Sequence, residues 1–302
     1  MSDTIVREED LRFVREAFER FAPIGALAGG GVTRLGFSPE EDAMHEAFAA
    51  LCAQEGFDVT ADGIGNSFAS LPGAKGPYTL LGSHLDSVVE GGRFDGVAGV
   101  IAGLLVMRRL REEGCPLPVR TAAFRCEESS RFGRATIGSG LLTQEISVLD
   151  VMNLTDAEGV RFADILQERR MPLLPEKIEG VTRYLELHIE QGKILEESKR
   201  QVGIVKAIAA PRRFTVRLTG LAEHSGATPM QLRSDALCAA AEIILGVERI
   251  GRNESIYHSV ATVGVIRNTP NVLNVIPGEV SLGVDLRGID TASLARMETA
   301  LG

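Results

Sequence analysis

The sequence lacks an excess of basic residues: its 302 residues include 32 Lys and Arg and 41 Asp and Glu, which gives a net charge of −9. Because a protein that binds a phosphate backbone needs clustered positive charge, this balance argues against nucleic acid as a partner. The sequence also lacks a long apolar run. The longest, residues 96–107, falls short of the roughly 20 residues that a membrane-spanning helix needs, so no membrane partner is expected.

Paired cysteines and a signal peptide are missing as well. The four cysteines lie far apart and form no Cys-x-x-Cys pair, which is typical of free thiols in a reducing compartment. The N-terminus is polar and acidic, with no basic stretch followed by an apolar one, so it does not resemble a secretory signal. These absences predict a cytoplasmic protein.

What is present is the composition and patterning of a folded α/β protein. Hydrophobic residues make up 44% of the chain and charged residues 24%, which excludes disorder, and the length favours two domains or one large one. A capping box, with Ser38 as N-cap and Glu41 three residues later, starts the second of two opening helices. Strands and helices then alternate, which predicts a catalytic domain over residues 1–210 with a largely parallel central sheet. The expected strands are 78–82, 119–125 and 183–187, with a helix from Asp95 between the first two.

From residue 211 the pattern changes to strands with one polar face. The predicted order is strand, helix, strand, strand, helix, which is typical of a smaller α+β domain of ferredoxin-like type over residues 211–302. A second capping box, at Thr228, is expected to start its first helix. A split β-α-β unit needs one more strand, so we expect this chain to be a truncated version of a longer one.

Three groups of potential metal ligands follow predicted strands. The carboxyl ends of parallel strands meet at one edge of a sheet, so these groups are expected to lie close together. Imidazoles and carboxylates are the ligands of zinc and similar divalent ions, and one carboxylate can bridge two ions. Asp86 is placed to accept the second ring N–H of His84. The groups are His84, Asp86 and Asp95 after the first strand, Glu127 and Glu128 after the second, and His188 after the third.

Each group taken alone has an ordinary structural interpretation. A His-x-Asp sequence is commonly a surface pair, two adjacent glutamates commonly start a helix, and His188 could be a core histidine. Their common position at the ends of predicted parallel strands favours a metal-dependent hydrolase over these alternatives.

Several motifs resemble those of a known family. Residues 82–99, the pair Glu127-Glu128 and residues 188–192 are similar to the motifs of the M20 metallopeptidase-like amidohydrolases. Within that family the chain is most similar to the branch of N-carbamoyl-L-amino-acid hydrolases, allantoate amidohydrolases and β-ureidopropionases. Further segments of the same pattern are residues 33–38, 220–230 and 270–277.

The resemblance implies two divalent metal ions in each subunit, zinc or manganese, with cobalt and nickel as alternatives. By resemblance, His84 and His188 would hold one ion, and Asp95 would bridge it to a second ion that Glu128 binds. Glu127 would act as the general base and then as the general acid.

The resemblance also implies that the second domain is a lid and dimerisation domain with substrate contacts. His224, Asn274 and Arg287 would hold the substrate carbonyl and carboxylate, with His224 donating to a developing oxyanion, and Gln191 would contribute from the metal side. Without the resemblance, His224 could equally cap the helix near Thr228, and Arg287 could be an ordinary strand residue. Whether His224 acts in its own subunit or across a homodimer stays open.

The implied reaction is hydrolysis of the terminal ureido group of an N-carbamoyl-L-amino acid to the amino acid, ammonia and carbon dioxide. Allantoate and β-ureidopropionate are alternative substrates, and a binding relative that has lost turnover is an alternative of another class. Family members continue further, return to the catalytic sheet and supply a last histidine to the second metal. None of the five histidines here fills that place, so a chain of this extent is expected to lack one ligand and could be inactive.

Overall fold

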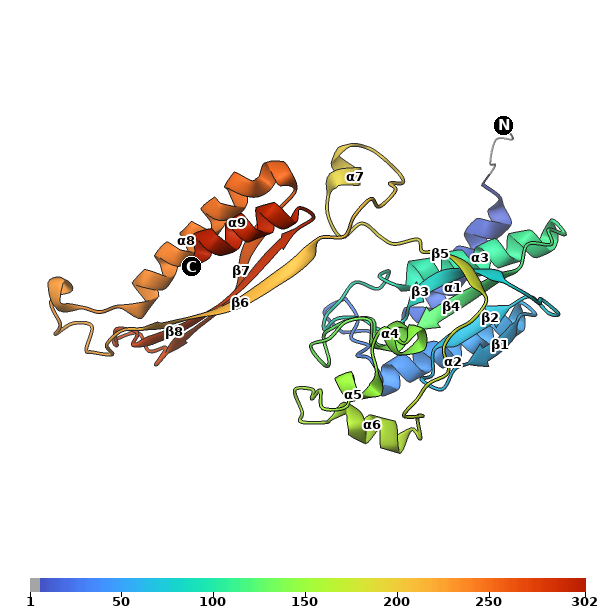
Figure 1. Ribbon diagram of the computed structural model, residues 1–302, viewed down its shortest axis with the longest axis horizontal. Helices are drawn as coiled ribbons and strands as arrows, with labels where there is room; N and C mark the ends of the chain where they lie inside the picture. Colours follow the sequence, from blue (N-terminus) through green and yellow to red (C-terminus); the bar gives the residue numbers. More distant parts are fainter. Residues whose placement is uncertain (1–5) are drawn as a thin grey trace. The chain divides into compact units, whose positions relative to one another are not determined.

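The computed structural model describes residues 6–302, and the chain divides into two compact units (Figure 1). The first unit ends at Lys193 and the second begins at Ile194, and each has its own sheet and its own core. The sheet of the second unit starts at Ala210. Among residues 6–302, no helix combines the length and the apolar character that crossing a bilayer requires.

A mixed five-stranded sheet forms the centre of the first unit, in the order β1-β2-β4-β3-β5. β3 pairs in parallel with β4 and β5, whereas β2 pairs antiparallel with β1 and β4. The sheet is therefore mixed, and the prediction of a largely parallel sheet is wrong for the β1–β2 and β2–β4 pairs. The β1–β2 hairpin was missed because its four-residue strands carry no long apolar run. The strands are β1 (Asp58–Ala61), β2 (Ser67–Ser70), β3 (Tyr78–His84), β4 (Val119–Phe124) and β5 (Val181–Leu185).

Helices cover the two faces of this sheet unequally. Leu81 of β3 is buried in one cluster with apolar residues of α1 (Glu8–Phe21), α2 (Pro39–Gln54) and α3 (Val97–Glu112). Successive strand residues point to opposite faces, so Leu80 packs on the other side, in a smaller cluster with Leu142 of α4. The remaining helices of the first unit are α4 (Ile137–Thr143), α5 (Val148–Val151) and α6 (Phe162–Glu168).

The start of α2 differs in one respect from the predicted capping box. The Ser38 hydroxyl accepts a hydrogen bond from the amide of Glu41 at 3.3 Å, as predicted. The Glu41 side chain accepts instead from the amide of Phe37 at 2.6 Å and turns into the core, where it pairs with Arg125 at 2.8 Å. The reciprocal half of the capping box is therefore absent, because a buried carboxylate is stabilised most by a buried cation and further hydrogen bonds.

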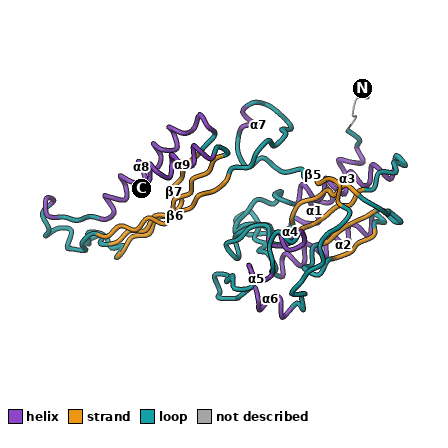
Figure 2. Tube along the Cα trace, viewed as in Figure 1, coloured by secondary structure: helices purple, strands orange, loops and turns teal. Residues whose placement is uncertain are grey.

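Three antiparallel strands in the order β6-β8-β7 form the sheet of the second unit, and Figure 2 shows its two long helices lying along it. Alternate residues of β8, such as Leu282 and Leu286, are buried in clusters with residues of α8 and α9. The order of elements from β6 onward is the one predicted from the sequence. The elements are α7 (Ile194–Glu197), β6 (Ala210–Thr219), α8 (Ala236–Glu254), η2 (Ser255–Tyr257), β7 (Val260–Thr269), β8 (Glu279–Gly288) and α9 (Thr291–Leu301).

The long helix of the second unit starts later than predicted. Thr228 precedes only a short 3-10 turn, η1 (Met230–Leu232), and α8 begins at Ala236. Its N-cap is Asp235, whose carboxylate accepts from the amides of Leu237 at 2.9 Å and Cys238 at 3.1 Å. The charged cap is the stronger one because it satisfies two free amides and also faces the positive end of the helix dipole.

Candidate metal centre

The parallel strands of the first unit bring the predicted ligands to one edge of its sheet. β3 ends at His84, which lies opposite Phe124, the last residue of β4. Glu127 and Glu128 follow three and four residues later, and His188 follows β5, which pairs with the other side of β3. The chain direction of these three strands therefore explains why ligands separated by about a hundred positions share one place.

Two groups of three ligands have their donor atoms close together. In the first group, the ligand atoms of His84, Asp95 and His188 all lie within 4.8 Å of one another. In the second group, the same holds for His84, Glu127 and Glu128. His84 belongs to both groups. Three nitrogen and oxygen ligands with room for a further one are typical of catalytic zinc and of related divalent ions, so these residues fit such an ion.

Negative charge dominates the electrostatics of this centre. Burial lowers the pKa of His84, but the carboxylates of Asp86, Glu127 and Asp95 outweigh it and raise that pKa to about 9. Burial raises the pKa of both Glu127 and Glu128, and their neighbouring carboxylates add to the effect, although His84 opposes it. Carboxylates that repel each other in this way are stabilised by a bound cation, which also competes with the proton on His84.

Asp86 lies beside His84 as predicted and makes two further hydrogen bonds. The Nδ1 atom of His84 lies 3.1 Å from the carbonyl oxygen of Asp86 and 3.3 Å from its carboxylate oxygen Oδ1. The carboxylate itself accepts from the amide of Glu127 at 3.0 Å and from the amide of Glu128 at 2.9 Å. Asp86 therefore fixes the backbone of the two glutamates in addition to orienting the imidazole.

The turn before α3 requires glycine. Gly96 has φ +66°, a left-handed conformation that other residues rarely adopt. A Cβ atom built there would lie 2.7 Å from Nδ1 of His84. Any larger residue at this position would therefore push the imidazole of His84 out of place.

The part of the centre that follows β5 is more open. The side chain of His188 is 40% exposed, and its Nε2 atom lies 3.3 Å from Oδ1 of Asp95. Gln191, which was predicted to bind substrate, donates from Nε2 to Oδ2 of Asp95 at 2.6 Å. In this structure Gln191 therefore orients a candidate metal ligand.

The remaining predicted substrate contacts all lie in the second unit. His224 pairs with Val275 in an isolated bridge, and the carbonyl of Asn274 accepts from the amide of Ser225 at 3.0 Å, so His224 and Asn274 are neighbours. Both lie beyond the end of the sheet at which Thr219 pairs with Glu279.

Arg287 lies at the opposite end of the same sheet from that pair. It donates from Nε to Asp285 at 2.8 Å. The eight residue steps along β8 from Glu279 to Arg287 correspond to about 27 Å at about 3.4 Å per step. Within one copy of the second unit, Arg287 and His224 are therefore too far apart to contact the same small molecule.

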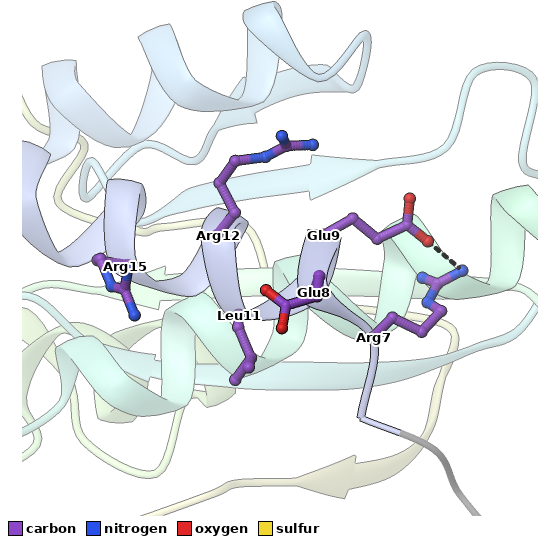
Figure 3. A pocket seen from close by; sticks show the side chains of 6 residues that line it. All are labelled: Arg7, Glu8, Glu9, Leu11, Arg12 and Arg15. Carbon is purple, nitrogen blue, oxygen red and sulfur yellow. Dashed lines mark ion pairs between the residues drawn. The ribbon is translucent and has the colours of Figure 1, made fainter.

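A surface hollow of the first unit lies apart from the metal ligands. It surrounds the start of α1 on the outside of the unit (Figure 3), with an ion pair between Arg7 and Glu9 at 2.9 Å. It contains none of the predicted site residues, so we do not assign it a role in catalysis. The residues that line it are Arg7, Glu8, Glu9, Leu11, Arg12 and Arg15.

Two residues that were not predicted from the sequence contact residues 125 and 126, just before the glutamate pair. Asn66 accepts from the amide of Arg125 at 2.9 Å, and Glu41 accepts from the amide of Cys126 at 2.7 Å. Both are fully buried polar side chains. A local signal existed only for Glu41, and it indicated a helix cap rather than a contact 85 residues away.

Comparison with known proteins accounts for this arrangement. The model of peptidase family M20/M25/M40 matches residues 80–282, which include every predicted metal ligand. The chain belongs to peptidase family M20. The resemblance to M20 proteins that the motifs indicated is thereby confirmed.

Relatives include proteins named for two of the three activities of the branch that the motifs resemble. An N-carbamoyl-L-amino acid amidohydrolase of Geobacillus stearothermophilus is 38% identical over 275 residues, which cover 88% of this chain and 66% of that protein. An allantoate amidohydrolase of Escherichia coli (strain K12) is 36% identical over 294 residues, with coverages of 93% and 71%. The crystal structure of a hydantoinase/carbamoylase family amidase from Burkholderia ambifaria has a TM-score of 0.78 and 38% identity over 97% of this chain and 72% of that chain. The chain thus spans about 70% of the length of these proteins.

Proposed function

We propose that this M20 protein is a metal-dependent amidohydrolase that cleaves the terminal ureido group of an N-carbamoyl-L-amino acid. The observation that supports it most is the pair of three-ligand groups that share His84, the second of which includes Glu127. The similarity to the Geobacillus N-carbamoyl-L-amino acid amidohydrolase supports the choice of substrate class. The products would be the amino acid, ammonia and carbon dioxide.

The proposed chemistry depends on Glu127. Its Oε2 atom lies 3.9 Å from Nε2 of His84, so its carboxylate faces the place where the ligand atoms converge. A divalent cation bound there would supply Lewis-acid polarisation of the ureido carbonyl and would make a water molecule more acidic. Glu127 would take the proton of the attacking water and deliver it to the leaving nitrogen.

The metal content proposed for this chemistry is two divalent ions, zinc or manganese, with cobalt and nickel as alternatives. His84, Asp95 and His188 would hold one ion, and Glu128 would contribute to the second. By the resemblance, Asp95 would be shared between the two. The two groups of ligand atoms support two adjacent positions, and their nitrogen and oxygen donors suit several of these metals.

The substrate contacts proposed in the second unit favour a homodimer. His224 would donate to the developing oxyanion with Asn274 beside it, and Arg287 would bind the substrate carboxylate with its planar guanidinium. Arg287 lies at one end of the sheet of the second unit and His224 lies beyond the other end, so one copy cannot direct both at one substrate. In a homodimer, one copy would supply His224 and the other Arg287.

The test is ammonia release by the purified protein after addition of Zn²⁺, Mn²⁺, Co²⁺ or Ni²⁺ in turn. The panel contains several N-carbamoyl-L-amino acids, allantoate and β-ureidopropionate. We expect release from at least one carbamoyl amino acid. Release from allantoate alone would favour the alternative activity, allantoate hydrolysis, for which the Escherichia coli relative is named. Bound metal without release from any compound would favour a binding protein.

A further inference from the structure

Four consecutive backbone amides at the end of β4 each donate to a buried side chain. This segment connects the last residue of the strand to the glutamate pair of the metal centre. The acceptors come from three separate parts of the first unit, so the segment is fixed from several sides at once. The bonds run from Arg125 to Asn66 at 2.9 Å, from Cys126 to Glu41 at 2.7 Å, and from Glu127 and Glu128 to Asp86 at 3.0 and 2.9 Å.

Cys126 is the residue of this segment with unusual backbone geometry. Its φ of +48° is a left-handed conformation, which a residue other than glycine adopts only where its surroundings hold it there. Glu41 Oε1 accepts the amide hydrogen of this residue. The loop before α2 also lies against it, because a Cβ built on Gly36 would lie 2.6 Å from the Cβ of Cys126.

Both oxygens of Glu41 are engaged, which makes its carboxylate hard to replace. Oε1 accepts from Cys126, and Oε2 accepts from the amide of Phe37 at 2.6 Å and from the guanidinium of Arg125 at 2.8 Å. The side chain is fully buried. An amide side chain has one acceptor oxygen and one donor NH₂. A glutamine at this position would therefore direct its NH₂ at a backbone N–H, whichever way it turned.

We propose that Glu41 is a positioning residue for the hydrolytic reaction. Its carboxylate holds Cys126 in the left-handed conformation, and this turn directs Glu127 and Glu128 toward His84. Catalytic groups lose efficiency when they move by as little as 1 Å, so the loss of this turn would act on the chemical step. The inference rests on the proposed function in so far as Glu127 is the base.

The chain offers a matched control in Asp156. Asp156 is also a buried carboxylate, and it accepts from two backbone amides and one arginine: Val160 at 2.8 Å, Glu158 at 3.1 Å and Arg131 at 3.0 Å. Its amide bonds lie in the segment before α6 and not in the glutamate segment. A loss of general stability should therefore affect Asp156→Asn and Glu41→Gln alike, whereas a loss of positioning should affect only the second.

The experiment compares Glu41→Gln with Asp156→Asn in two measurements. We expect kcat of Glu41→Gln to fall by about 100-fold while KM stays within a few-fold of wild type, as for a misplaced catalytic group. We also expect a changed visible absorption spectrum after loading with Co²⁺, because that spectrum reports ligand geometry. Asp156→Asn should keep both the kcat and the spectrum of the wild type. Equal kcat and equal spectra in the two variants would overturn the proposal.

A second variant covers the case in which Glu41→Gln does not fold. Glu41→Asp keeps the charge beside Arg125, but its shorter side chain cannot reach the amides of Phe37 and Cys126 together. We expect an intermediate loss of kcat and an altered Co²⁺ spectrum, and wild-type values of both would overturn the proposal. If the wild type releases ammonia from no compound in the panel, the proposed function fails. The Co²⁺ spectra then still decide the role of Glu41, because they need no substrate.

Discussion

The candidate metal centre has two halves, one formed by residues that follow β3 and β4 and the other by residues that follow β5. The two halves are held in different ways. His84, at the end of β3, is 3% exposed, and the segment after β4 is fixed by Asp86, Glu41 and Asn66. His188, after β5, is 40% exposed at its side chain, and its Nδ1 atom lies 2.7 Å from the carbonyl of its neighbour Ile189. One half is therefore organised by long-range contacts in the core, and the other lies at an open edge.

The position of each strand in the sheet explains this contrast. β3 and β4 are interior strands, with paired neighbours on both sides and buried residues along most of their length. β5 is an edge strand whose residues are mostly exposed. Ligands that follow interior strands inherit a rigid support, whereas ligands that follow an edge strand rely on contacts of their own. Substitutions in the buried half should therefore have larger effects than those in the open half.

The largest effect is expected from Glu127→Gln, in the buried half. Loss of a general base typically costs 10²–10⁴-fold in rate, and we expect a fall in ammonia release of about 10³-fold. Metal content should stay at the wild-type level, because the four other candidate ligands remain: His84, Asp95, Glu128 and His188. Glu145→Gln, at an exposed position, serves as the control. Full activity of the Glu127 variant would remove this residue from the mechanism.

The next largest effect is expected on metal content, when one histidine from each half is replaced in turn. His84 belongs to both ligand groups, whereas His188 belongs to one. We expect His84→Ala to abolish stoichiometric metal binding, and His188→Ala to retain about one ion on the remaining group. Metal analysis after dialysis measures this, with His258→Ala, at an exposed position of the second unit, as control. Equal losses in the two variants would contradict the division into halves.

A smaller effect is expected from Asp86→Asn, which tests the support of the buried half. The asparagine can still accept from one of the two glutamate amides, but its NH₂ would face the other. Residues that orient metal ligands typically contribute 10–100-fold to metal affinity, and we expect a loss in that range. Competition for the metal with a fluorescent metal indicator would measure this affinity. Asp58→Asn, on the exposed β1, is the control. Unchanged affinity would show that the two amide bonds are dispensable.

The smallest effect is expected from Gln191→Ala, in the open half. This variant removes the hydrogen bond to Asp95, which is accessible to water. Water can replace such a bond, so we expect a rise of only a few-fold in KM and in the metal dissociation constant, with kcat almost unchanged. Gln167→Ala, on the exposed side of α6, is the control. A loss as large as that of Asp86→Asn would mean that the open half is as dependent on its support as the buried one.

Much of the centre could be predicted because its ligands follow recognisable strands. The buried runs before His84 and Glu127 are local patterns, and parallel chain direction is enough to bring their ends together. The β1–β2 hairpin carried no such pattern, so the mixed character of the sheet was not predicted. The start of α8 was misplaced because two nearby residues, Thr228 and Asp235, both suit an N-cap, and only the fold selects between them.

The sequence by itself therefore determined which residues could bind a metal and the order in which strands deliver them, because these properties depend on residue type and on neighbours along the chain. Only the tertiary structure decided how those residues are held. Glu41 and Asp86 have local patterns that indicate a helix cap and a histidine partner, yet their carboxylates also bind amides 41 to 85 residues away. The physical reason is that a buried carboxylate binds the donors that folding brings to it, and their identity is not encoded in its sequence neighbourhood.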